Sequence, residues 1–142
     1  MSKLVLAVSA ALLAGSFSLA PIASFAQSDY PNKPITLVVP YPAGGANDVL
    51  GRLVGQKLTE QLKQSVVVDN KPGAGTTIGT AIVAKAAPDG YTLVLGSLAS
   101  HAISPNLYAK PGYDAVTDFA PIGLIGVAPM VLIVGNDSKY KD

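Results

Sequence analysis

The sequence contains no cysteine and only one histidine, which removes two common sources of protein chemistry. Without cysteine the chain can form no disulfide, no thiolate nucleophile and no cysteine-ligated metal site. The single imidazole belongs to His101, and one histidine without a recognisable partner is weak support for acid–base or metal chemistry. We therefore predict no metal and no cofactor.

Charged residues are also scarce, at 13% of the chain. Ten Lys and Arg stand against nine Asp and Glu, which gives a formal net charge of +1 at pH 7. Nucleic-acid binding needs clustered cations that neutralise several phosphates, and a balanced chain gives no sign of it. We predict no nucleic-acid partner, and attraction to a membrane surface is equally unsupported.

The motifs of several enzyme classes are missing too. The glycine clusters at residues 42–48 and 73–79 lack the spacing G-x-G-x-x-G, and the chain has neither a P-loop Gly-Lys-Ser/Thr nor a G-x-S-x-G elbow. An exported or mislocalised nucleotide-binding or hydrolytic enzyme stays the alternative. Asp69 stands where a ribose-binding acid is expected, and a hydrolase built on His101 would need partners that the sequence does not place.

The first stretch of the chain has the pattern of an export signal. Lys3 precedes an almost wholly apolar run at residues 4–14, and Ser24-Phe25-Ala26 has the small-x-small pattern of a cleavage site. The run is shorter than the roughly 20 residues that span a bilayer. We predict a cleavable signal peptide at residues 1–26, cut after Ala26, with an uncleaved anchor as the alternative. The mature chain is then formally neutral.

Past the signal peptide, short apolar runs alternate with helical patterns. Three strands are predicted at residues 35–40, 65–70 and 91–95, and two helices at residues 47–63 and from position 76 or 77 to about 86. A β-α-β-α-β order with short connections implies a parallel sheet covered by helices. The predicted fold class is therefore α/β.

Caps and faces follow from the same patterns. Asn47 or Asp48 is predicted to cap the first helix, and Thr76 or Thr77 the second, by accepting from a first-turn N–H. Arg52 falls on the wetter side of the first helix. The opposite side is apolar and carries Val49, Leu50, Leu53, Val54, Leu58 and Leu62.

Glycine-rich loops follow the first two predicted strands and should meet at the carboxyl edge of the sheet. Unpaired N–H groups and the positive end of a helix dipole lie at such points, and glycine lets a ligand oxygen approach the amide closely. Two such loops can hold one carboxylate. The predicted ligand-binding residues are Pro42, Ala43, Gly44, Gly45, Asn47, Asp48, Pro72, Gly73, Ala74 and Gly75.

A third segment leaves the third predicted strand at the same edge. Ser97 and His101 are therefore predicted to line the same cleft. The alternatives are that the serine hydroxyl is a local turn partner, and that His101 packs against or caps the turn at residues 104–106. No catalytic residue is predicted.

The far end of the chain has two apolar extended segments, at residues 119–128 and 129–134, without a helical pattern between them. Polar residues 136–142 follow and resemble the approach to a further element. Unpaired apolar segments weaken a small sheet. We therefore expect the chain to be an amino-terminal fragment.

Several motifs in this order resemble the Bug-type solute-binding proteins of tripartite tricarboxylate transporters. The resemblance covers essentially the whole mature chain. It is carried by YPNKPI at residues 30–35, VPYPAGGAND at 39–48, VVDNKPGAG at 67–75, AKAAPDGYTL at 84–93 and YDAVTDFAP at 113–121.

The resemblance implies a periplasmic, two-lobed receptor with a type II periplasmic-binding-protein fold that presents a small carboxylate or related metabolite to a membrane permease. In that family the loops matching residues 42–48 and 72–75 clamp a ligand carboxylate with backbone amides and water. Asp48 matches an acidic position, where we expect it to cap and shape the loop, because a bare carboxylate would repel an anionic ligand. The segment with Ser97 and His101 matches a third cleft loop.

The resemblance also divides the chain. Residues 27–126 are predicted to form a partial lobe 1, and residues 127–142 a crossover toward a second lobe that this chain lacks. The complete protein is predicted to be a monomer and not an enzyme. Its ligand stays open among citrate, other di- or tricarboxylates, amino acids, and aromatic or vitamin-like acids.

Overall fold

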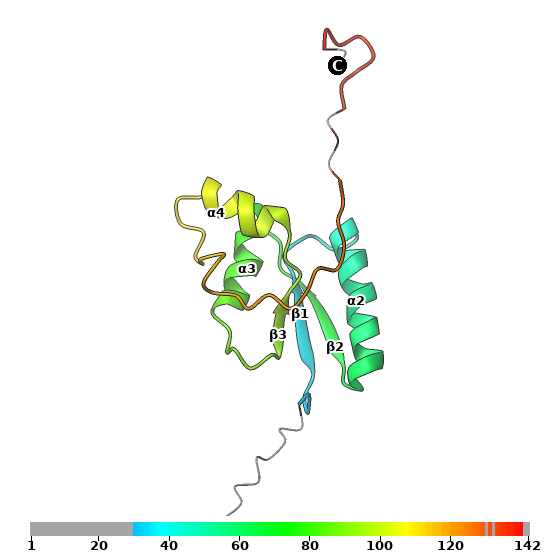
Figure 1. Cartoon of the computed structure of the whole chain (residues 1–142), viewed down its shortest axis with the longest axis vertical. Helices are drawn as coiled ribbons and strands as arrows, with labels where there is room; N and C mark the ends of the chain where they lie inside the picture. Colours follow the sequence, from blue (N-terminus) through cyan, green and yellow to red (C-terminus); the bar gives the residue numbers. More distant parts are fainter. Residues whose placement is uncertain (1–29, 130, 132, 141–142) are drawn as a thin grey trace, which may run out of the picture. The chain divides into compact units, whose positions relative to one another are not determined.

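The computed structural model describes residues 30–129, 131 and 133–140, whose elements Figure 1 traces along the chain. The predicted signal peptide and its cut after Ala26 lie outside the described residues. Three strands alternate with helices and short helical turns along the chain. This alternation confirms the predicted α/β class.

A parallel sheet of three strands forms the centre of the fold. Strand β1 (Ile35–Val39) lies between β2 (Val66–Asn70) and β3 (Thr92–Val94). Parallel neighbours need a crossover connection, which the intervening helices supply. All three predicted strands are present, and each is slightly shorter than predicted.

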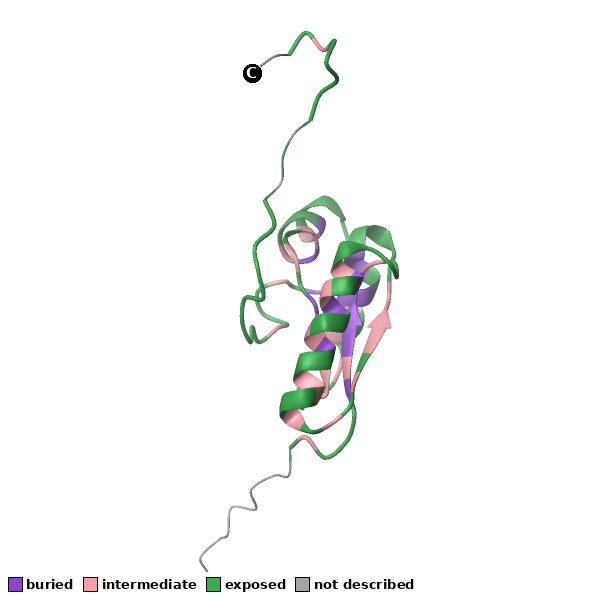
Figure 2. Ribbon diagram, turned by 90° about the vertical axis from the view of Figure 1, so that its right-hand side faces the viewer, coloured by how far each residue is buried: buried purple, intermediate pink, exposed green. Residues whose placement is uncertain are grey.

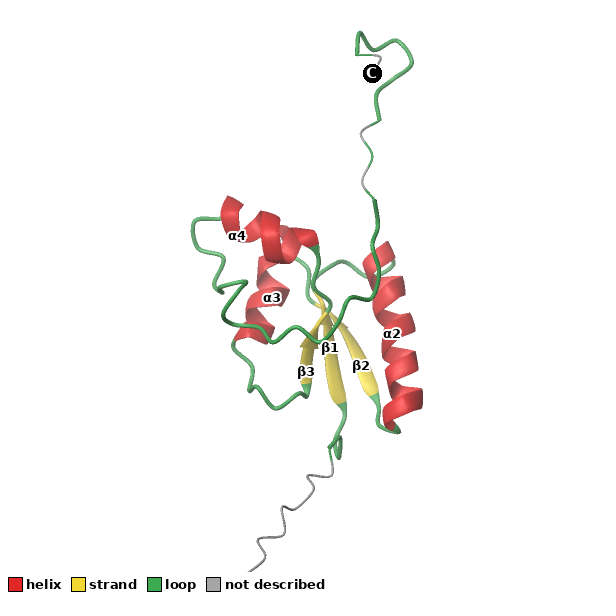
Figure 3. Ribbon diagram, in the orientation of Figure 1, coloured by secondary structure: helices red, strands yellow, loops and turns green. Residues whose placement is uncertain are grey.

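Two helices flank the sheet (Figure 3). Helix α2 (Ala46–Leu62) packs against β1 and β2, and α3 (Thr77–Ala84) packs against β1 and β3. A short 3-10 turn, η1 (Ala74–Thr76), leads into α3, and a π-helical turn, η2 (Ala99–Ile103), continues into α4 (Ser104–Leu107). Because η1 contacts η2, the loop after β2 and the segment after β3 are neighbours.

The side of α2 that meets the sheet differs from its predicted apolar side. Gly51 and Gly55 are buried there, whereas Val49 and Leu53 are 62% and 54% exposed. A Cβ on Gly51 would lie 2.7 Å from Cγ2 of Val39, so the helix lies closer to the strand than a larger residue permits. Amphipathic periodicity follows large apolar residues and therefore does not detect a contact face made by glycines.

Buried apolar side chains gather on the central strand, which Figure 2 colours mostly as buried. Ile35 and Val39 are fully buried, and Leu37 and Leu95 are 4% exposed. Leu37, Val39 and Leu95 form one cluster, to which Val54 of α2 adds its partly buried side chain. The packed centre fixes the strand ends from which the three loops start.

Residues 120–129 have neither helix nor strand, and their side chains are exposed (Figure 2). Ile122 and Leu124 are 84% and 83% exposed. The absence of a helix here agrees with the predicted extended segments, while their division into lobe and crossover stays a prediction. No helix in the part of the chain that the structure describes is both long and apolar enough to cross a membrane.

Candidate functional site

The three loops start from one edge of the sheet. Val39 and Asn70, the last residues of β1 and β2, lie opposite each other in the parallel register. Just beyond, the N–H of Lys71 donates to the Val39 carbonyl at 2.9 Å, and the N–H of Leu95 donates to the Val38 carbonyl at 2.9 Å. The strands therefore end together, as the sequence predicts.

The first loop is exposed from Pro42 to Gly45, and one of its amides has a partner inside the protein. Gly44 has φ of +84°, a conformation that favours glycine. Its N–H donates to Oδ2 of Asp48 at 2.8 Å. This hydrogen bond favours a loop-closing role for the Gly44 amide, and its predicted role as a ligand contact stays a prediction.

Asp48 does not cap α2 in the predicted way. The N-cap position is Gly45, without a side-chain cap, so neither Asn47 nor Asp48 is the capping residue. Asp48 lies in the first turn and reaches back to Gly44, much as the acidic residue of a capping box reaches back to its cap. This contact confirms the expected loop-shaping role and leaves the amides of Gly45, Ala46 and Asn47 without protein acceptors in the described part of the chain.

Arg52 holds the Asp48 carboxylate from the next turn of the helix. Its Nε donates to Asp48 Oδ2 at 3.1 Å, and its Nη2 lies 3.0 Å from Asp48 Oδ1. Arg52 first, and the Gly44 N–H next, lower the pKa of Asp48 from 3.8 to about 2. The carboxylate is charged at neutral pH but is already neutralised by its own partners.

Acid unfolding should report this carboxylate. Because the folded pKa lies below the unfolded one, the stabilising contribution of Asp48 is complete above about pH 4 and is lost as the pH falls to about 2. Urea unfolding between pH 5 and 2 should show a steeper loss of stability in the wild type than in Asp48→Asn. Equal pH dependence in the two proteins would contradict the assigned ion pair.

The second loop has an unusual backbone. Four consecutive residues, Gly73, Ala74, Gly75 and Thr76, have φ of +130°, +44°, +60° and +85°. Positive φ is uncommon outside glycine and rarer still for a β-branched residue. From Pro72 to Gly75 the loop is exposed, so its amides lie at the surface of the strand edge.

The predicted threonine cap of α3 is absent. Thr76 occupies the N-cap position without a side-chain cap, because its left-handed backbone turns the side chain into the protein. Its Oγ1 is buried and has no partner in the described residues. Thr77 instead donates its hydroxyl to the Ala74 carbonyl at 2.9 Å, which closes the loop on itself.

The third segment is tied together by its own hydroxyls. Ser97 Oγ lies 2.5 Å from the hydroxyl of Tyr41, and the Ser97 N–H donates to Oγ of Ser100 at 2.8 Å. Ser100 Oγ in turn lies 2.8 Å from Nδ1 of His101. These contacts favour the local-partner alternative for Ser97, whose polar atoms are all engaged within the protein.

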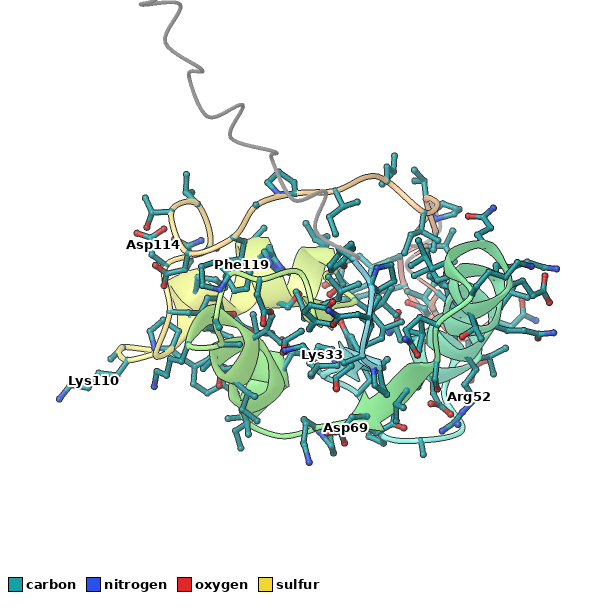
Figure 4. All side chains as sticks on the ribbon, turned by 90° about the horizontal axis from the view of Figure 1, so that it is seen from below. Lys33, Arg52, Asp69, Lys110, Asp114 and Phe119 are labelled. Atoms are coloured by element: carbon teal, nitrogen blue, oxygen red, sulfur yellow. The ribbon has the colours of Figure 1, made fainter. Side chains whose placement is uncertain are left out.

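His101 packs among aromatic rings. Phe119 meets the imidazole edge-on with 4.8 Å between ring centroids, and the Tyr113 hydroxyl donates to the carbonyl of Ser100. A Cβ on Gly96 would lie 2.9 Å from the imidazole, so the ring covers that glycine. Figure 4 shows Phe119 and Arg52 well apart from each other, and the ring contact places Phe119 against η2, the turn that carries His101. These contacts favour a packing role for His101, with Phe119 and Gly96 as its observed neighbours.

Mild acid should loosen this packing. Burial lowers the pKa of His101 below 6.5, so the unfolded chain binds the proton more readily than the folded one. Its contribution to stability is complete above about pH 6.5 and decreases as the pH falls through that value. Thermal melting at pH 7.5 and 5.5 should therefore show a larger loss for the wild type than for His101→Gln. If His101→Gln lost as much melting temperature as the wild type between pH 7.5 and 5.5, groups other than His101 would cause the pH dependence.

The glycine loops form an open edge, not a closed cavity. A hollow of about 380 Å³ lies beside α2 and β2, between Arg52 and Val66, and another of about 270 Å³ lies between His101 and Asp114. Neither is lined by the glycine loops. Among the described residues no three His, Cys, Asp or Glu side chains gather as a metal site needs. The arrangement offers backbone donors to an anion.

Comparisons with known proteins agree with this geometry. Residues 50–142 match the profile described as "Tripartite tricarboxylate transporter family receptor". Protein BugT of Bordetella pertussis is 40% identical over 111 residues, which cover 78% of this chain and 34% of BugT. The chain spans about a third of the length of the curated relatives it matches.

Two solved structures are similar to the described fold. The periplasmic binding protein BugD gives a TM-score of 0.63 at 46% identity, over 66% of this chain and 31% of BugD. MatC from Rhodopseudomonas palustris, solved with bound malate, gives 0.62 at 38% identity, over 65% of this chain and 31% of MatC. The sheet and its helices are therefore one lobe of the α/β fold of periplasmic binding proteins.

Proposed function

Because this chain belongs to the tripartite tricarboxylate transporter receptor family, we propose that it captures a small carboxylate-bearing metabolite in the periplasm and presents it to a membrane permease. The family is one of solute-binding receptors and not of enzymes. The periplasmic location is supported by the similarity to BugD. Export through residues 1–26 with a cut after Ala26, and a monomeric complete protein, are further parts of the proposal.

One observation carries the proposal. Two exposed loops at the same edge of the sheet offer backbone N–H groups that no protein atom accepts in the described part of the chain. In the first loop these are the amides of Gly45, Ala46 and Asn47, at the positive end of α2. Such donors suit a carboxylate, because their hydrogen bonds and the helix dipole stabilise its negative charge without a positively charged side chain.

The second loop supplies the other half of the proposed carboxylate site. Positive φ at Gly73, Ala74 and Gly75 shapes an exposed turn before α3, and the N–H groups of these three residues have no protein acceptor in the described part of the chain. Ser97 and His101 would act indirectly, by holding the third segment at the rim. The proposed contacts are therefore the amides of residues 45–47 and 73–75, with Pro42 and Pro72 limiting the loops.

The ligand class is proposed from chemistry and similarity together. MatC, at 38% identity, was solved with malate. Backbone donors recognise a carboxylate on any acid, so we propose a small di- or tricarboxylate as the first class to test. Lobe 1 is proposed to comprise residues 27–126, with residues 127–142 crossing toward a second lobe.

A thermal-shift and calorimetric titration of the full-length mature protein tests this function. Malate, adipate and citrate are compared with malamide, which keeps the shape of malate but lacks the charge. At a hundredfold excess over its Kd, a true ligand stabilises the folded protein by about 2.7 kcal/mol. Stabilisation by an acid but not by malamide is expected. Equal stabilisation by malamide, or none by any acid, would contradict the proposal.

A further inference from the structure

A continuous set of hydrogen bonds, which no sequence motif indicates, joins the first loop, the end of β2 and the third segment. The set begins at Asp48, which accepts from Gly44 and is held by Arg52. Nη2 of Arg52 also donates to Oδ1 of Asn70 at 3.2 Å. One guanidinium therefore links the first loop to the end of β2, directly before the second loop.

Asn70 also forms a hydrogen bond with the residue that precedes the first loop. Its Nδ2 donates to the backbone carbonyl of Tyr41 at 3.1 Å. The Tyr41 side chain then reaches the third segment, where its hydroxyl lies 2.5 Å from Ser97 Oγ. Tyr41 is partly buried and packs against the apolar cluster under α2, so the sheet fixes it in place.

Building on the proposed function, we propose that Arg52, Asn70 and Tyr41 are positioning residues that set the spacing of the three strand-edge loops before a carboxylate binds. Each of the three contacts two of these segments at once. None needs to touch the ligand. The ligand then meets donors already held in place.

Physical reasons favour a positioning role over a purely stabilising one. The Arg52–Asn70 hydrogen bond is exposed and the Asn70–Tyr41 bond is only partly buried, so both contribute less to global stability than the ion pair between Arg52 and the buried Asp48. Loops rich in glycine have many conformations when unbound, and fixing them beforehand lowers the entropic cost of binding. The expected effect therefore falls on affinity and loop dynamics more than on the melting temperature.

Amide exchange in the ligand-free protein tests the connection directly. Asn70→Ala removes the hydrogen bonds to Arg52 and Tyr41. Native Asn70 has no hydrogen bond with Gly44 or Ser97, so the backbone amides of these two residues report the connection indirectly. We expect the exchange of both amides, measured by NMR, to accelerate by at least about threefold. Lys57→Gln, which removes an exposed ion pair with Glu60 on the same helix, is the matched control and should leave both amides unchanged.

Affinity measurements test the consequence for binding. Arg52→Gln, Asn70→Ala and Tyr41→Phe should each weaken malate, or whichever tested acid binds most tightly, by about three- to tenfold. Arg52→Lys keeps a charge beside Asp48 but cannot bond both Asp48 and Asn70 through one planar fork. It should therefore restore the low pKa of Asp48 without restoring the affinity.

The outcomes separate the two proposals. If the wild type binds no acid, the proposed function is wrong, and the amide-exchange result still decides whether the loops are coupled. If the wild type binds an acid but Asn70→Ala changes neither the exchange nor the affinity, the positioning role is wrong. A loss of affinity accompanied by an equal loss in Lys57→Gln would also overturn it.

Discussion

Replacing Gly73 by valine is expected to weaken carboxylate binding by more than about tenfold, that is by about 1.4 kcal/mol or more, while the sheet stays folded. Gly73 has φ of +130°, which a β-branched residue does not adopt. The added Cβ would lie 2.6 Å from Cδ1 of Ile78, but that side chain is 51% exposed and can move aside. The loop should change its backbone and lose its exposed amides, and calorimetry with the tightest-binding acid measures the loss.

The matched control is a strained glycine outside the loops. Gly112 has φ of +86°, and its Cβ would meet only Ala81 at 3.5 Å. Gly112→Val should therefore lower the melting temperature without changing the affinity. Gly44→Val should behave like Gly73→Val, because it breaks the turn that Asp48 closes. Unchanged affinity in both loop variants would remove these loops from the site.

The largest loss of stability is expected for Gly79→Ala. A Cβ on Gly79 would lie 2.5 Å from the carbonyl oxygen of Lys71 and 2.9 Å from Cβ of Pro40. Both obstacles belong to rigid strand ends, so the helix α3 must move away from the sheet. Overpacking of this kind costs about 1–3 kcal/mol, and urea unfolding measures it.

Gly123→Ala is the control for this loss, because no atom lies within 4 Å of its added Cβ in the described part of the chain. It should unfold at nearly the wild-type urea concentration. If Gly79→Ala also did so, α3 would not be held against the strand ends as closely as the structure has it.

Strands and loop positions could be predicted because they depend on local pattern. Runs rich in β-branched residues at 35–39 and 66–68 favour strands, and the glycine clusters that follow them indicate loops at the strand ends. The parallel order followed from the helices between the strands. These features need no knowledge of which side chains meet.

Contacts between distant residues were beyond the sequence patterns. Arg52 was assigned to the wetter side of its helix, where periodicity places it, yet its guanidinium joins Asp48 to Asn70. The predicted caps failed for a related reason. Backbone angles at Gly45 and Thr76 decide where a neighbouring side chain points, and the residue type alone does not fix those angles.

His101 illustrates the limit for site residues. The sequence correctly places it after β3, in the segment that leaves the carboxyl edge of the sheet, but cannot tell whether the imidazole faces solvent or the protein. Phe119 settles that point from 18 positions along the chain, by packing against the ring at 4.8 Å. An aromatic partner at that separation leaves no periodic signal.

The most direct test of the account is an NMR titration of the isotope-labelled, full-length mature protein with the acid that binds most tightly among malate, adipate and citrate. The account predicts saturable shifts of the backbone amides at residues 45–47 and 73–75, with the Gly44 amide still bonded to Asp48. Saturable binding that leaves those amides unshifted, for example with shifts confined to the surroundings of His101, would contradict the claim that the strand-edge loops hold the carboxylate.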